Sequence, residues 1–514
     1  MELRATPGIE VVFLEKYKRM HYPSLQEFLK LSKKGNVIPV YYEMNADLDT
    51  PVSAFLKIEK NNEYAFLLES VEGQEKLARY SFLGVNPSLI FKSKGRSIEI
   101  IHSRKNTSRK FLADLSPLDE VKKIMLKFKS VPVAGLPRFY GGLVGFIGYD
   151  MVRFFESLPD KNPDDLKAPD SILMLMDTLL VFDHVKHTIK IVSNVILPDK
   201  ANLSTREKVR IYKETLTKID KAHFELNKPV KESNRLVKGL DLKPASNFTK
   251  SKFENIIKTA KDYIKKGDII QVVLSQRFKL RTNKDAFMIY RTLRSLNPSP
   301  YMYLLKFKEF TLVGASPEML VRCEDGLVQT RPIAGTRPRG KDGAEDIRLA
   351  AQLIKDKKER AEHLMLVDLG RNDLGRISKI GTVKVSEFMN VEKYSHVMHL
   401  VSEVKGRLDN NRYDIYDVLK AAFPAGTVTG SPKIRAMEII DELENTRRGP
   451  YAGCVGYFSF SHNMDTCITI RTIVIKGNTA YVQAGAGIVA DSRPEKEYTE
   501  TLNKAMALIE AIKQ

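Results

Sequence analysis

Short runs of residues that favour β-strands, separated by turn-forming residues, occupy the chain between residues 54 and 101. Asn61 and Asn62, for example, separate the run at residues 54–58 from the run at residues 64–70. Short turns connect antiparallel strands, whereas parallel strands need a long crossover. The pattern therefore predicts an antiparallel meander in this part of the chain, with residues 54–58 as one of its strands.

Helical and extended segments alternate in the rest of the chain. Apolar residues at helical spacing predict helices at residues 117–128, 205–226, 344–369, 413–422 and 432–444, and a last helix from Ser492. Strand patterns lie at residues 172–182, 188–195, 269–280, 383–405 and 480–484, with two long strands in residues 451–475 and a hairpin at Asp325 and Gly326. Residues 227–247 have no sustained period and many polar and breaker residues. We therefore divide the chain into a β-rich region, residues 1–232, and a second region, residues 233–514.

Two glycine-rich segments share one pattern. YGGLVGF at residues 140–146 and YAGCVGY at residues 451–457 have Tyr, Gly, Val and Gly in the same register. Glycine within a strand marks a place where another backbone approaches closely, so the two segments could lie side by side in a sheet. A single short match is equally compatible with chance.

The composition excludes several classes of protein. Hydrophobic residues make up 43% and charged residues 28% of the 514 residues, which is too apolar for a disordered chain. The 83 Lys and Arg exceed the 63 Asp and Glu and give a net charge of +20. No basic run is interleaved with aromatic residues, so we expect no nucleic-acid partner. The most apolar stretch, residues 171–182, is short and is broken by Asp177, so we expect no membrane span.

The cysteines indicate a reducing compartment. Cys323, Cys454 and Cys467 are odd in number and have no C-x-x-C spacing, which argues against disulfides and structural zinc. Residues 1–20 lack the apolar segment of a secretory signal. We therefore expect a cytoplasmic protein, with Cys454 in the core of a strand.

Two pairs of glutamates are candidates for a metal site. Glu359 and Glu362 are three residues apart on one expected helix, and Glu497 and Glu500 repeat this spacing on another. Each pair therefore projects from one helix face. Brought together, the pairs would form an all-oxygen site, which suits a hard cation such as Mg²⁺. Glutamates at this spacing are more often part of a solvated helix face, and that alternative stays open.

Other polar segments are candidates for binding an anion or for acid–base chemistry. In PAGTVTGSPK, residues 424–433, we expect Ser431 to cap a helix whose free backbone N–H groups could bind a carboxylate. Gly485 and Gly487 follow a strand with too little chain after them for a dinucleotide fold, which leaves contact with a small anion or a tight turn. His396 and His399 lie on opposite faces of an expected strand, so a metal pair is excluded, whereas either could act alone in a cleft.

Several motifs of the second region occur in the order found in one enzyme family. They are GDIIQVVLSQRF at residues 267–278, GASPE at 314–318, RPIAGTRPRG at 331–340, HLMLVDLGRNDL at 363–374, YSHVMH at 394–399 and GAG at 485–487. With these motifs the chain resembles the chorismate-binding enzymes, and among them the large subunits of anthranilate synthases, over residues 247–513. The first region is similar more loosely, through LLES at residues 67–70 and RYSFLG at 79–84. The resemblance implies an α+β fold of large mixed, mainly antiparallel sheets flanked by helices, to which both halves of the chain contribute.

The resemblance also implies a Mg²⁺-dependent lyase reaction that begins tryptophan biosynthesis. Ammonia adds to the chorismate ring, the 4-hydroxyl leaves, and elimination of pyruvate gives anthranilate. By motif position, Glu318 is the acid that assists loss of the hydroxyl, and His399 takes part in pyruvate elimination. Glu362 and Glu500 hold the metal, with Glu359 and Glu497 close by. The residues implied to surround chorismate are Gly335, Thr336, Thr427, Tyr451, Arg471, Gly485, Ala486, Gly487 and Lys504.

Two positions distinguish the nucleophiles used within the family. Members that add water generally have Lys at the position of Gln271, and many aminodeoxychorismate synthases have Lys at the position of Ala334. Both lysines are missing here, so the resemblance favours ammonia as the nucleophile and anthranilate as the product, with Gln271 in the catalytic set. The chain has no glutamine-hydrolysing domain, which implies a separate glutamine amidotransferase subunit, component II of an anthranilate synthase.

The resemblance assigns a regulatory role to the first region. Residues 1–232 would sense tryptophan as a feedback inhibitor, and residues 233–514 would bind chorismate. LLES and NPSPYM, residues 297–302, resemble the feedback site, in which Ser70, Pro300, Tyr301 and Met302 would line the pocket. Without the resemblance, LLES would be interpreted as a buried strand edge and NPSPYM as a loop.

Three alternatives remain open at this point. An aminodeoxychorismate synthase component of folate biosynthesis would keep pyruvate in its product. A catalytically idle tryptophan-binding regulator would need none of the four glutamates or His399, all of which are retained. A nucleic-acid binder would show a mobility shift of DNA or RNA that depends on salt.

Overall fold

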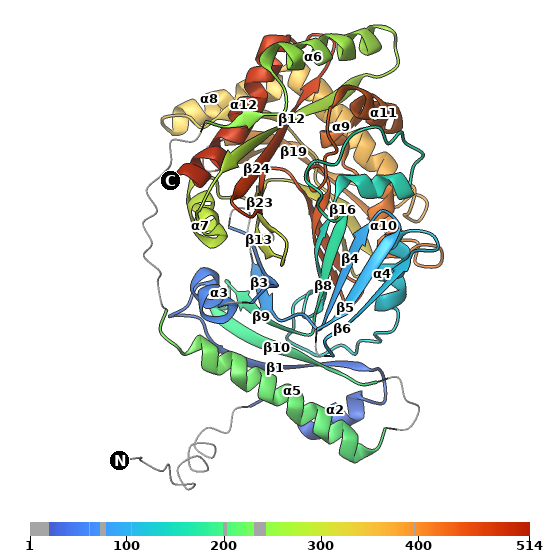
Figure 1. Ribbon diagram of the computed structural model, residues 1–514, viewed down its shortest axis with the longest axis vertical. Helices are drawn as coiled ribbons and strands as arrows, with labels where there is room; N and C mark the ends of the chain where they lie inside the picture. Colours follow the sequence, from blue (N-terminus) through green and yellow to red (C-terminus); the bar gives the residue numbers. More distant parts are fainter. Residues whose placement is uncertain are drawn as a thin grey trace.

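Two large antiparallel sheets pack against each other, and helices cover their outer faces (Figure 1). The computed structural model describes residues 20–60, 62–71, 79–103, 105–198, 203–230, 243–394 and 397–514. The main apolar core lies between the sheets, where Phe82 of one sheet packs on Tyr457 of the other with ring centroids 6.0 Å apart. Every strand ladder among the described residues is antiparallel, and the expected α+β fold of large, mainly antiparallel sheets flanked by helices is confirmed.

The first sheet runs from β12 near the top of Figure 1 to β1 near the bottom. Its strands, in spatial order, are β1 (Val37–Asn45), β10 (Thr188–Ile196), β9 (Thr178–Asp183), β3 (Tyr80–Val85), β2 (Ala65–Glu69), β13 (Tyr301–Lys306), β14 (Thr311–Ser316), β23 (Thr472–Lys476), β24 (Thr479–Ile488), β12 (Gln271–Arg281) and β11 (Ala245–Ser246), with β20 (Gly430–Ser431) paired to β12.

The second sheet contains the strands that carry several motifs of the sequence. In spatial order they are β17 (Ile333–Pro338), β19 (Val397–Arg407), β16 (Leu327–Thr330), β15 (Met319–Glu324), β22 (Met464–Ile468), β21 (Cys454–Ser459), β7 (Gly142–Ile147), β8 (Ser171–Met176), β4 (Leu89–Lys94), β5 (Ser97–His102) and β6 (Thr107–Leu112), with β18 (Lys384–Lys393) paired to β19.

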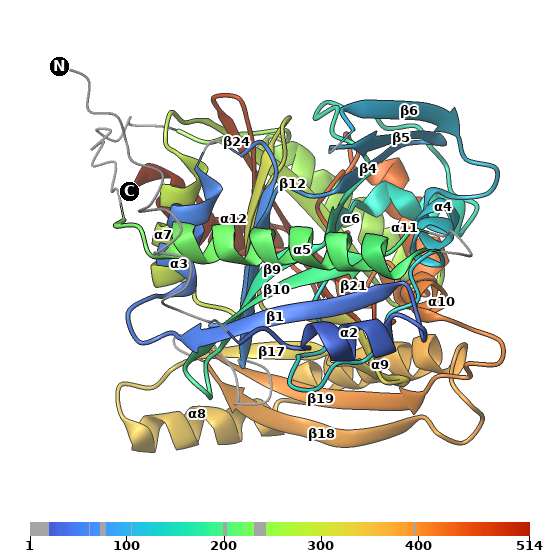
Figure 2. The same ribbon diagram turned by 90° about the horizontal axis from the view of Figure 1, so that it is seen from below.

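The helices lie outside the two sheets. Figure 2 shows α5 extended along β10 and β1, and α8 and α9 beside the end of the second sheet that holds β17 to β19. The helices are α2 (Leu25–Leu31), α3 (Pro51–Glu59), α4 (Pro117–Met125), α5 (Thr205–Leu226), α6 (Lys250–Lys265), α7 (Ala286–Leu296), α8 (Gly343–Lys355), α9 (Lys357–Gly375), α10 (Ile415–Ala422), α11 (Lys433–Leu443) and α12 (Pro494–Lys513), with short 3₁₀ turns η1 (Tyr149–Phe154) and η2 (Gly426–Val428).

Both sheets contain strands from both regions of the chain. In the first sheet Leu67 of β2 lies opposite Leu304 of β13, and in the second sheet Gly145 of β7 lies opposite Gly456 of β21. The two glycine-rich segments are therefore adjacent strands, which confirms one of the two alternatives for their shared pattern. The boundary expected at residues 232 and 233 lies outside the described residues, and it divides the sequence without dividing the core.

Several expected elements differ from the observed ones. Residues 54–58 belong to helix α3, which starts after the capping residue Thr50 with Pro51 in its first turn, so the expected strand there is wrong. The strand expected at 172–182 is two strands, β8 and β9, and residues 451–475 form three strands. The helix expected at 344–369 is divided at Asp356, whose side chain accepts hydrogen bonds from the first backbone N–H groups of α9. Ser431 does not cap α11, because it pairs with Gln271 in β20 and Pro432 occupies the cap position.

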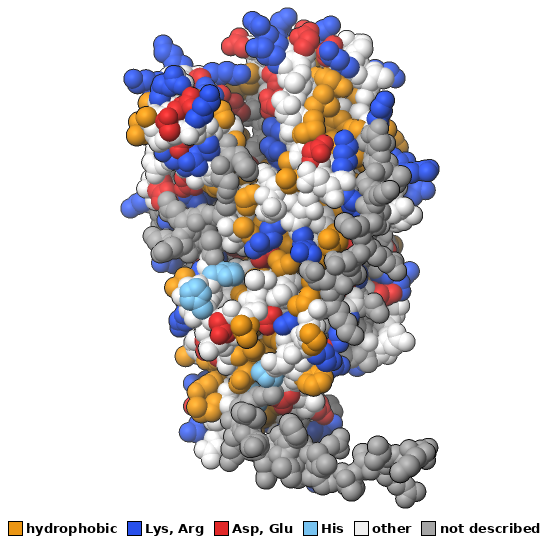
Figure 3. Space-filling view, turned by 90° about the vertical axis from the view of Figure 1, so that its left-hand side faces the viewer, with side chains coloured by type: hydrophobic (Ala, Val, Ile, Leu, Met, Phe, Trp, Pro, Cys, Tyr) orange, Lys and Arg blue, Asp and Glu red, His pale blue; other side chains and the backbone are white. Residues whose placement is uncertain are grey.

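Figure 3 shows the charged side chains on one face of the molecule. On the face shown in Figure 3, acidic side chains are interspersed among the basic ones. No helix in the described part of the chain is both long and apolar enough to cross a membrane.

Candidate active site

A cavity of about 650 Å³ opens where the two sheets separate, in the size range of small-molecule sites. Its walls come from β12 and β24 of the first sheet, β17 and β19 of the second, helices α9 and α12, and η2. We call it the main cavity. It is lined by nearly all residues predicted for catalysis, substrate binding and metal binding: Gln271, Glu318, Gly335, Thr336, Glu359, Glu362, His399, Thr427, Tyr451, Arg471, Gly485, Gly487, Glu497, Glu500 and Lys504.

Ala486 is the exception among these predictions. Successive residues of a strand point to opposite faces, so Gly485 and Gly487 face the main cavity while Ala486 faces away from it. Its side chain is fully buried in the apolar cluster beneath α6 and α11, with Leu274 and Ala436. The Ala486 side chain therefore cannot face a substrate in this cavity, and contact between the backbone of Ala486 and substrate stays a prediction.

Glu318 has the properties of a general acid. It lies between β14 and β15 and is only 7% exposed. Burial raises the pKa of its carboxyl to about 8, against the opposing effects of the neighbouring Thr427 hydroxyl and the Lys504 ammonium group. The carboxyl is therefore protonated at neutral pH and can give a proton to a leaving group in the cavity.

His399 is held in one tautomer. Its Nδ1 lies 2.9 Å from the Gly335 carbonyl oxygen and 3.1 Å from the Thr336 hydroxyl. A carbonyl oxygen can only accept, so Nδ1 carries the proton and Nε2 keeps its lone pair. Burial lowers the pKa of His399, so the ring is neutral at neutral pH and Nε2 can accept a proton. His396 lies outside the described residues.

The two glutamate pairs face the same cavity from two helices, α9 and α12. Burial raises the pKa of Glu362, and the like charge of Glu359 adds to this; burial also raises the pKa of Glu497. Glu500 forms an ion pair with Lys504 over 2.7 Å. Among the described residues, no three His, Cys, Asp or Glu side chains are grouped closely enough to form a metal site by themselves.

The donor chemistry nevertheless fits Mg²⁺. All four side chains offer carboxylate oxygens, and Mg²⁺ is usually held by one or two carboxylates while water and substrate oxygens complete its shell. Burial is the main cause of the raised pKa of Glu362 and the like charge of Glu359 the second, and a cation beside these two carboxylates would offset both effects. Glu362 and Glu500 would be its ligands in such a site.

Gln271 presents an unsatisfied acceptor. Its side chain is 3% exposed, and its Oε1 has no hydrogen-bond partner, while Nε2 lies 3.5 Å from Glu362 Oε1. Gly487 leaves room for this side chain, because a Cβ there would lie 2.5 Å from Nε2 and would force the end of the Gln271 side chain to move. Across the cavity the Tyr451 hydroxyl lies close to Gly485 in the same way, with 2.8 Å to a Cβ built on it. Both glycines of the GAG motif therefore make room for polar side chains of the cavity.

Basic groups lie on the same walls. Arg471 is one of them; it donates from Nη1 to the Lys504 carbonyl oxygen and keeps further N–H donors. Lys504 donates from Nζ to the Gly485 carbonyl oxygen. Lys358, which the sequence analysis missed, adds another cation to the lining. Positive and negative side chains thus share the cavity, which suits a substrate with carboxylate groups.

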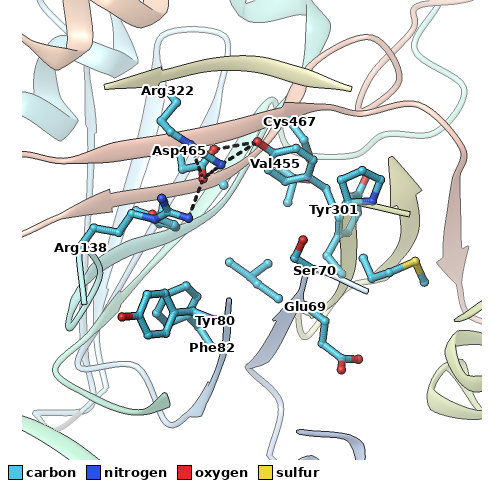
Figure 4. Close-up of a pocket in the computed structure, with 16 residues that line it drawn as sticks. Glu69, Ser70, Tyr80, Phe82, Arg138, Tyr301, Arg322, Val455, Asp465 and Cys467 are labelled. Atoms are coloured by element: carbon cyan, nitrogen blue, oxygen red, sulfur yellow. Dashed lines mark hydrogen bonds and ion pairs between the residues drawn. The ribbon is translucent and has the colours of Figure 1, made fainter. Parts of the chain in front are cut away.

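A second cavity lies between the sheets (Figure 4) and contains all four residues predicted to bind tryptophan, Ser70, Pro300, Tyr301 and Met302. Its polar part is centred on Asp465, which binds Arg322 through hydrogen bonds and accepts another from the Tyr301 hydroxyl. Three buried polar atoms in its walls have no partner: Ser70 Oγ, Arg138 Nε and Tyr457 Oη.

Arg138, Arg322 and Asp465 were missed by the sequence analysis. Each lies outside the motifs that carry the resemblance, and their only signal was a charged residue in or beside an otherwise apolar strand. The structure brings them together because β15 and β22 are adjacent, with Arg322 opposite Asp465.

The two cavities share a wall. Pro300 lines both of them. Cys467 of the second cavity is followed by Ile468, whose backbone N–H donates to the Glu318 carbonyl oxygen over 3.0 Å. The linings of the two cavities are therefore joined by a shared residue and by directly bonded neighbours.

The sequence and the structure of the chain are similar to those of known proteins. The model of the chorismate binding enzyme family matches residues 63–510. The chain belongs to the chorismate-binding enzymes. It is 49% identical to anthranilate synthase component 1 of Acetivibrio thermocellus over 96% of this chain and 99% of that protein, and 50% identical to its counterpart in Aquifex aeolicus over 95% and 97%. The crystal structure of anthranilate synthase component I from Streptococcus pneumoniae superposes with a TM-score of 0.74 at 38% identity, covering 90% of this chain and 98% of that one.

The raised pKa of Glu318 predicts a pH dependence of this chorismate-binding enzyme. A general acid works while it is protonated, so turnover of chorismate should fall as pH rises through about 8. Chorismate consumption at saturating co-substrate, measured from pH 6 to 10, should show this limb. The Glu318→Gln variant, which has no proton to give, should be much slower and lack the limb; an unchanged limb in the variant would assign it to another group.

Proposed function

We propose that the protein is the chorismate-converting component of an anthranilate synthase. It would convert chorismate and ammonia to anthranilate and pyruvate, the first step of tryptophan biosynthesis. The observation that carries the proposal is the composition of the main cavity: an acid at Glu318, a neutral base at His399 and four carboxylates from two helices surround one space. Relatives at about half identity over nearly the whole chain bear the name anthranilate synthase component 1.

The substrate would be held by its carboxylates. Arg471 offers a planar set of donors, Lys504 a compact cation, and Thr427 a hydroxyl beside Glu318. Bound Mg²⁺ at Glu362 and Glu500 would supply positive charge for a substrate carboxylate. Glu359 and Glu497 stand beside these two residues, one helical turn away, and would contact the ion directly or through water.

The reaction then needs one proton donor and one proton acceptor. Ammonia adds to a ring carbon, and the bond from the ring to the 4-hydroxyl breaks as Glu318 gives its proton to the departing oxygen, which leaves as water. The ammonium group formed on the ring then gives up one proton, which restores the Glu318 carboxyl. In the second step a proton leaves the ring, the bond from the ring to the enolpyruvyl oxygen breaks, and the departing enolpyruvate takes up a proton at its methylene carbon to become pyruvate. Nε2 of His399 is the available base for this step, because its Nδ1 is fixed by Gly335.

Ammonia is the nucleophile that these walls favour. Water needs a base to deprotonate it, whereas ammonia carries a free lone pair. Ala334 and Gln271 offer neither a base nor a covalent amine. The buried and unpartnered Oε1 of Gln271 can accept a hydrogen bond from ammonia and turn its lone pair toward the ring. A glutamine amidotransferase subunit would supply the ammonia from glutamine.

The second cavity would bind tryptophan as a feedback inhibitor. Its aromatic and apolar walls suit an indole ring, and the paired charges of Asp465, Arg322 and Arg138, together with unpartnered Ser70 Oγ, suit an amino acid head group. Pro300, shared by both cavities, offers a route by which occupancy of one changes the other.

The metal assignment predicts that turnover depends on two carboxylates. Glu362→Gln and Glu500→Gln should each reduce turnover by more than about 100-fold. Replacing even a residue that only hydrogen-bonds to a metal ligand typically lowers metal affinity or activity by about 10- to 100-fold. Glu510→Gln, on the same helix α12 but outside the cavity, is the matched control and should keep turnover. Calorimetry with Mg²⁺ after chelator treatment measures binding separately; near-normal turnover in both variants would refute the assignment.

The nucleophile assignment predicts the products. The purified chain with chorismate, Mg²⁺ and ammonium salts should form fluorescent anthranilate, and glutamine should work only when an amidotransferase subunit is added. A non-fluorescent amino product that retains the enolpyruvyl group would instead identify an aminodeoxychorismate synthase. Gln271→Lys should gain isochorismate formation by supplying a base for water. Isochorismate from the unmodified chain without ammonium would contradict the proposal.

The feedback site predicts a separation of activity from inhibition. Ser70→Arg should fill the second cavity and abolish inhibition by tryptophan while anthranilate formation without tryptophan continues, because Ser70 lies outside the main cavity. Ser70→Ala, which removes only the unpartnered hydroxyl, should weaken inhibition less. Inhibition curves with ammonium as donor measure both; unchanged tryptophan sensitivity of Ser70→Arg would place the inhibitor elsewhere.

A further inference from the structure

A buried ion pair lies behind the main cavity without touching it. Arg448 and Glu444 are 2% and 5% exposed, and their side chains form two hydrogen bonds, of 3.0 Å from Nε and 2.6 Å from Nη2. Neither residue lines the main cavity. Burying two charges costs several kcal/mol per ion, so such a pair contributes little net stability compared with apolar residues. Its contacts give it a different role.

Arg448 bonds to two walls of the main cavity at once. Nη1 donates to the Val428 carbonyl oxygen and Nη2 to the Val273 carbonyl oxygen, each over 2.7 Å. Val428 follows Thr427 in η2, and Val273 lies in β12; both residues line the cavity. The guanidinium group therefore bridges η2 and β12, in addition to the direct hydrogen bond from the Val273 backbone N–H to the Thr429 carbonyl oxygen.

The same guanidinium group contacts Tyr451. Its central carbon lies 5.5 Å from the centroid of the Tyr451 ring and 5.0 Å from that of Tyr149. A small cavity of about 10 Å³ is lined by Arg448, Tyr451 and Gln483. The guanidinium group attracts the face of the Tyr451 ring, and this attraction adds to the packing of the ring in the apolar core.

Glu444 extends the connection to the first sheet. Its Oε1 accepts hydrogen bonds from the Ser275 backbone N–H and hydroxyl, over 2.8 and 2.7 Å. The Ser275 hydroxyl in turn accepts from Nε2 of Gln483, which lines the main cavity, and Ser275 lies opposite Gly485 in the ladder of β12 and β24. One ion pair thus contacts, directly or through one residue, every wall that the first sheet and η2 provide.

We propose that Arg448 and Glu444 are positioning residues of the substrate site, which hold Tyr451, Gln483 and the Thr427–Val428 segment in the arrangement that binds chorismate. The inference rests on the proposed function for the identity of the substrate. If the pair served only the fold, its removal would lower the amount of folded protein. Each molecule that still folded would then bind substrate normally.

The test removes the pair without leaving one charge alone in the interior. In the double variant Arg448→Met with Glu444→Gln, both charges are lost, and such replacements are often tolerated by the fold. We expect KM and the calorimetric Kd for chorismate to rise by about tenfold or more and kcat/KM to fall on the order of 100-fold. The reason is that displaced residues of the cavity wall would no longer hold chorismate in the reactive orientation. KM for ammonium should stay within about twofold, since Gln271 does not contact the pair.

Asp441→Asn is the matched control. Asp441 is one turn earlier on α11 and 6% exposed, and it pairs with Arg153, but its partners Arg153, Lys161 and Asn162 lie outside the main cavity. It should lower the melting temperature while KM and Kd for chorismate stay within about twofold of the unmodified protein. A folded double variant with unchanged KM and Kd would overturn the inference.

A second variant decides the matter if the double variant does not fold. Arg448→Lys keeps the charge beside Glu444 but cannot reach both carbonyl oxygens and the carboxylate together. It should raise Kd for chorismate, and an unchanged Kd would overturn the inference. If the unmodified protein binds chorismate but forms no anthranilate, the proposed function fails while the comparison of Kd values still tests the pair.

Discussion

The antiparallel pairing of β7 with β21 joins the first part of the chain to the last, and both cavities depend on it. Gly145 and Gly456 lie opposite each other in this ladder, and both are closely covered on their other sides: a Cβ on Gly145 would lie 1.9 Å from the Ile172 carbonyl oxygen of β8, and one on Gly456 would lie 2.1 Å from the Asp465 carbonyl oxygen of β22. The ladder places β21 between β7 and β22. Residues of β21 and β22 then form one side of the second cavity, and Ile468 at the end of β22 holds the Glu318 backbone.

Exclusion of water shifts the pKa values of two groups of the main cavity in opposite directions: it raises that of Glu318 and lowers that of His399. The same burial that favours a protonated Glu318 favours a neutral His399, because it disfavours the charged form of each. A carboxyl that keeps its proton and an imidazole that lacks its second one are the two forms needed for proton donation and proton acceptance at neutral pH. Burial alone therefore accounts for both the protonated acid, Glu318, and the neutral base, His399.

Local sequence determined some elements well. The helix at residues 205–226 was predicted at its observed bounds, because Ser204 and Glu207 form a reciprocal cap ahead of a regular apolar pattern. The strand predicted at residues 54–58 was wrong because Ala, Phe, Leu and Ile in close succession are typical of a strand. The residue that caps the actual helix, Thr50, lies outside that run. Asp177 and Asp356 each divided one expected element into two.

The site was less accessible to local reasoning than the fold. Spacing indicated that each glutamate pair shares a helix face, but only the motif resemblance brought the pairs into one cavity, since their helices are far apart in the sequence. The resemblance included Ala486 among the residues around chorismate, but position in a motif does not tell which face of a strand a side chain occupies, and the Ala486 side chain faces away from the cavity. The pair of Arg448 and Glu444 had no sequence signal beyond a spacing of four residues, because its partners come from separate strands and turns.

The wall formed by Pro300 has a thermodynamic consequence. If a ligand in the second cavity lowers the affinity of the main cavity by some factor, the occupant of the main cavity lowers the affinity of the second cavity by the same factor. A rise in substrate concentration would then displace an inhibitor that it never touches. In rate measurements alone, two ligands at separate sites on either side of Pro300 would then show the kinetics of competitive inhibition. The concentration of inhibitor needed to slow the enzyme would rise with the concentration of substrate in the cell.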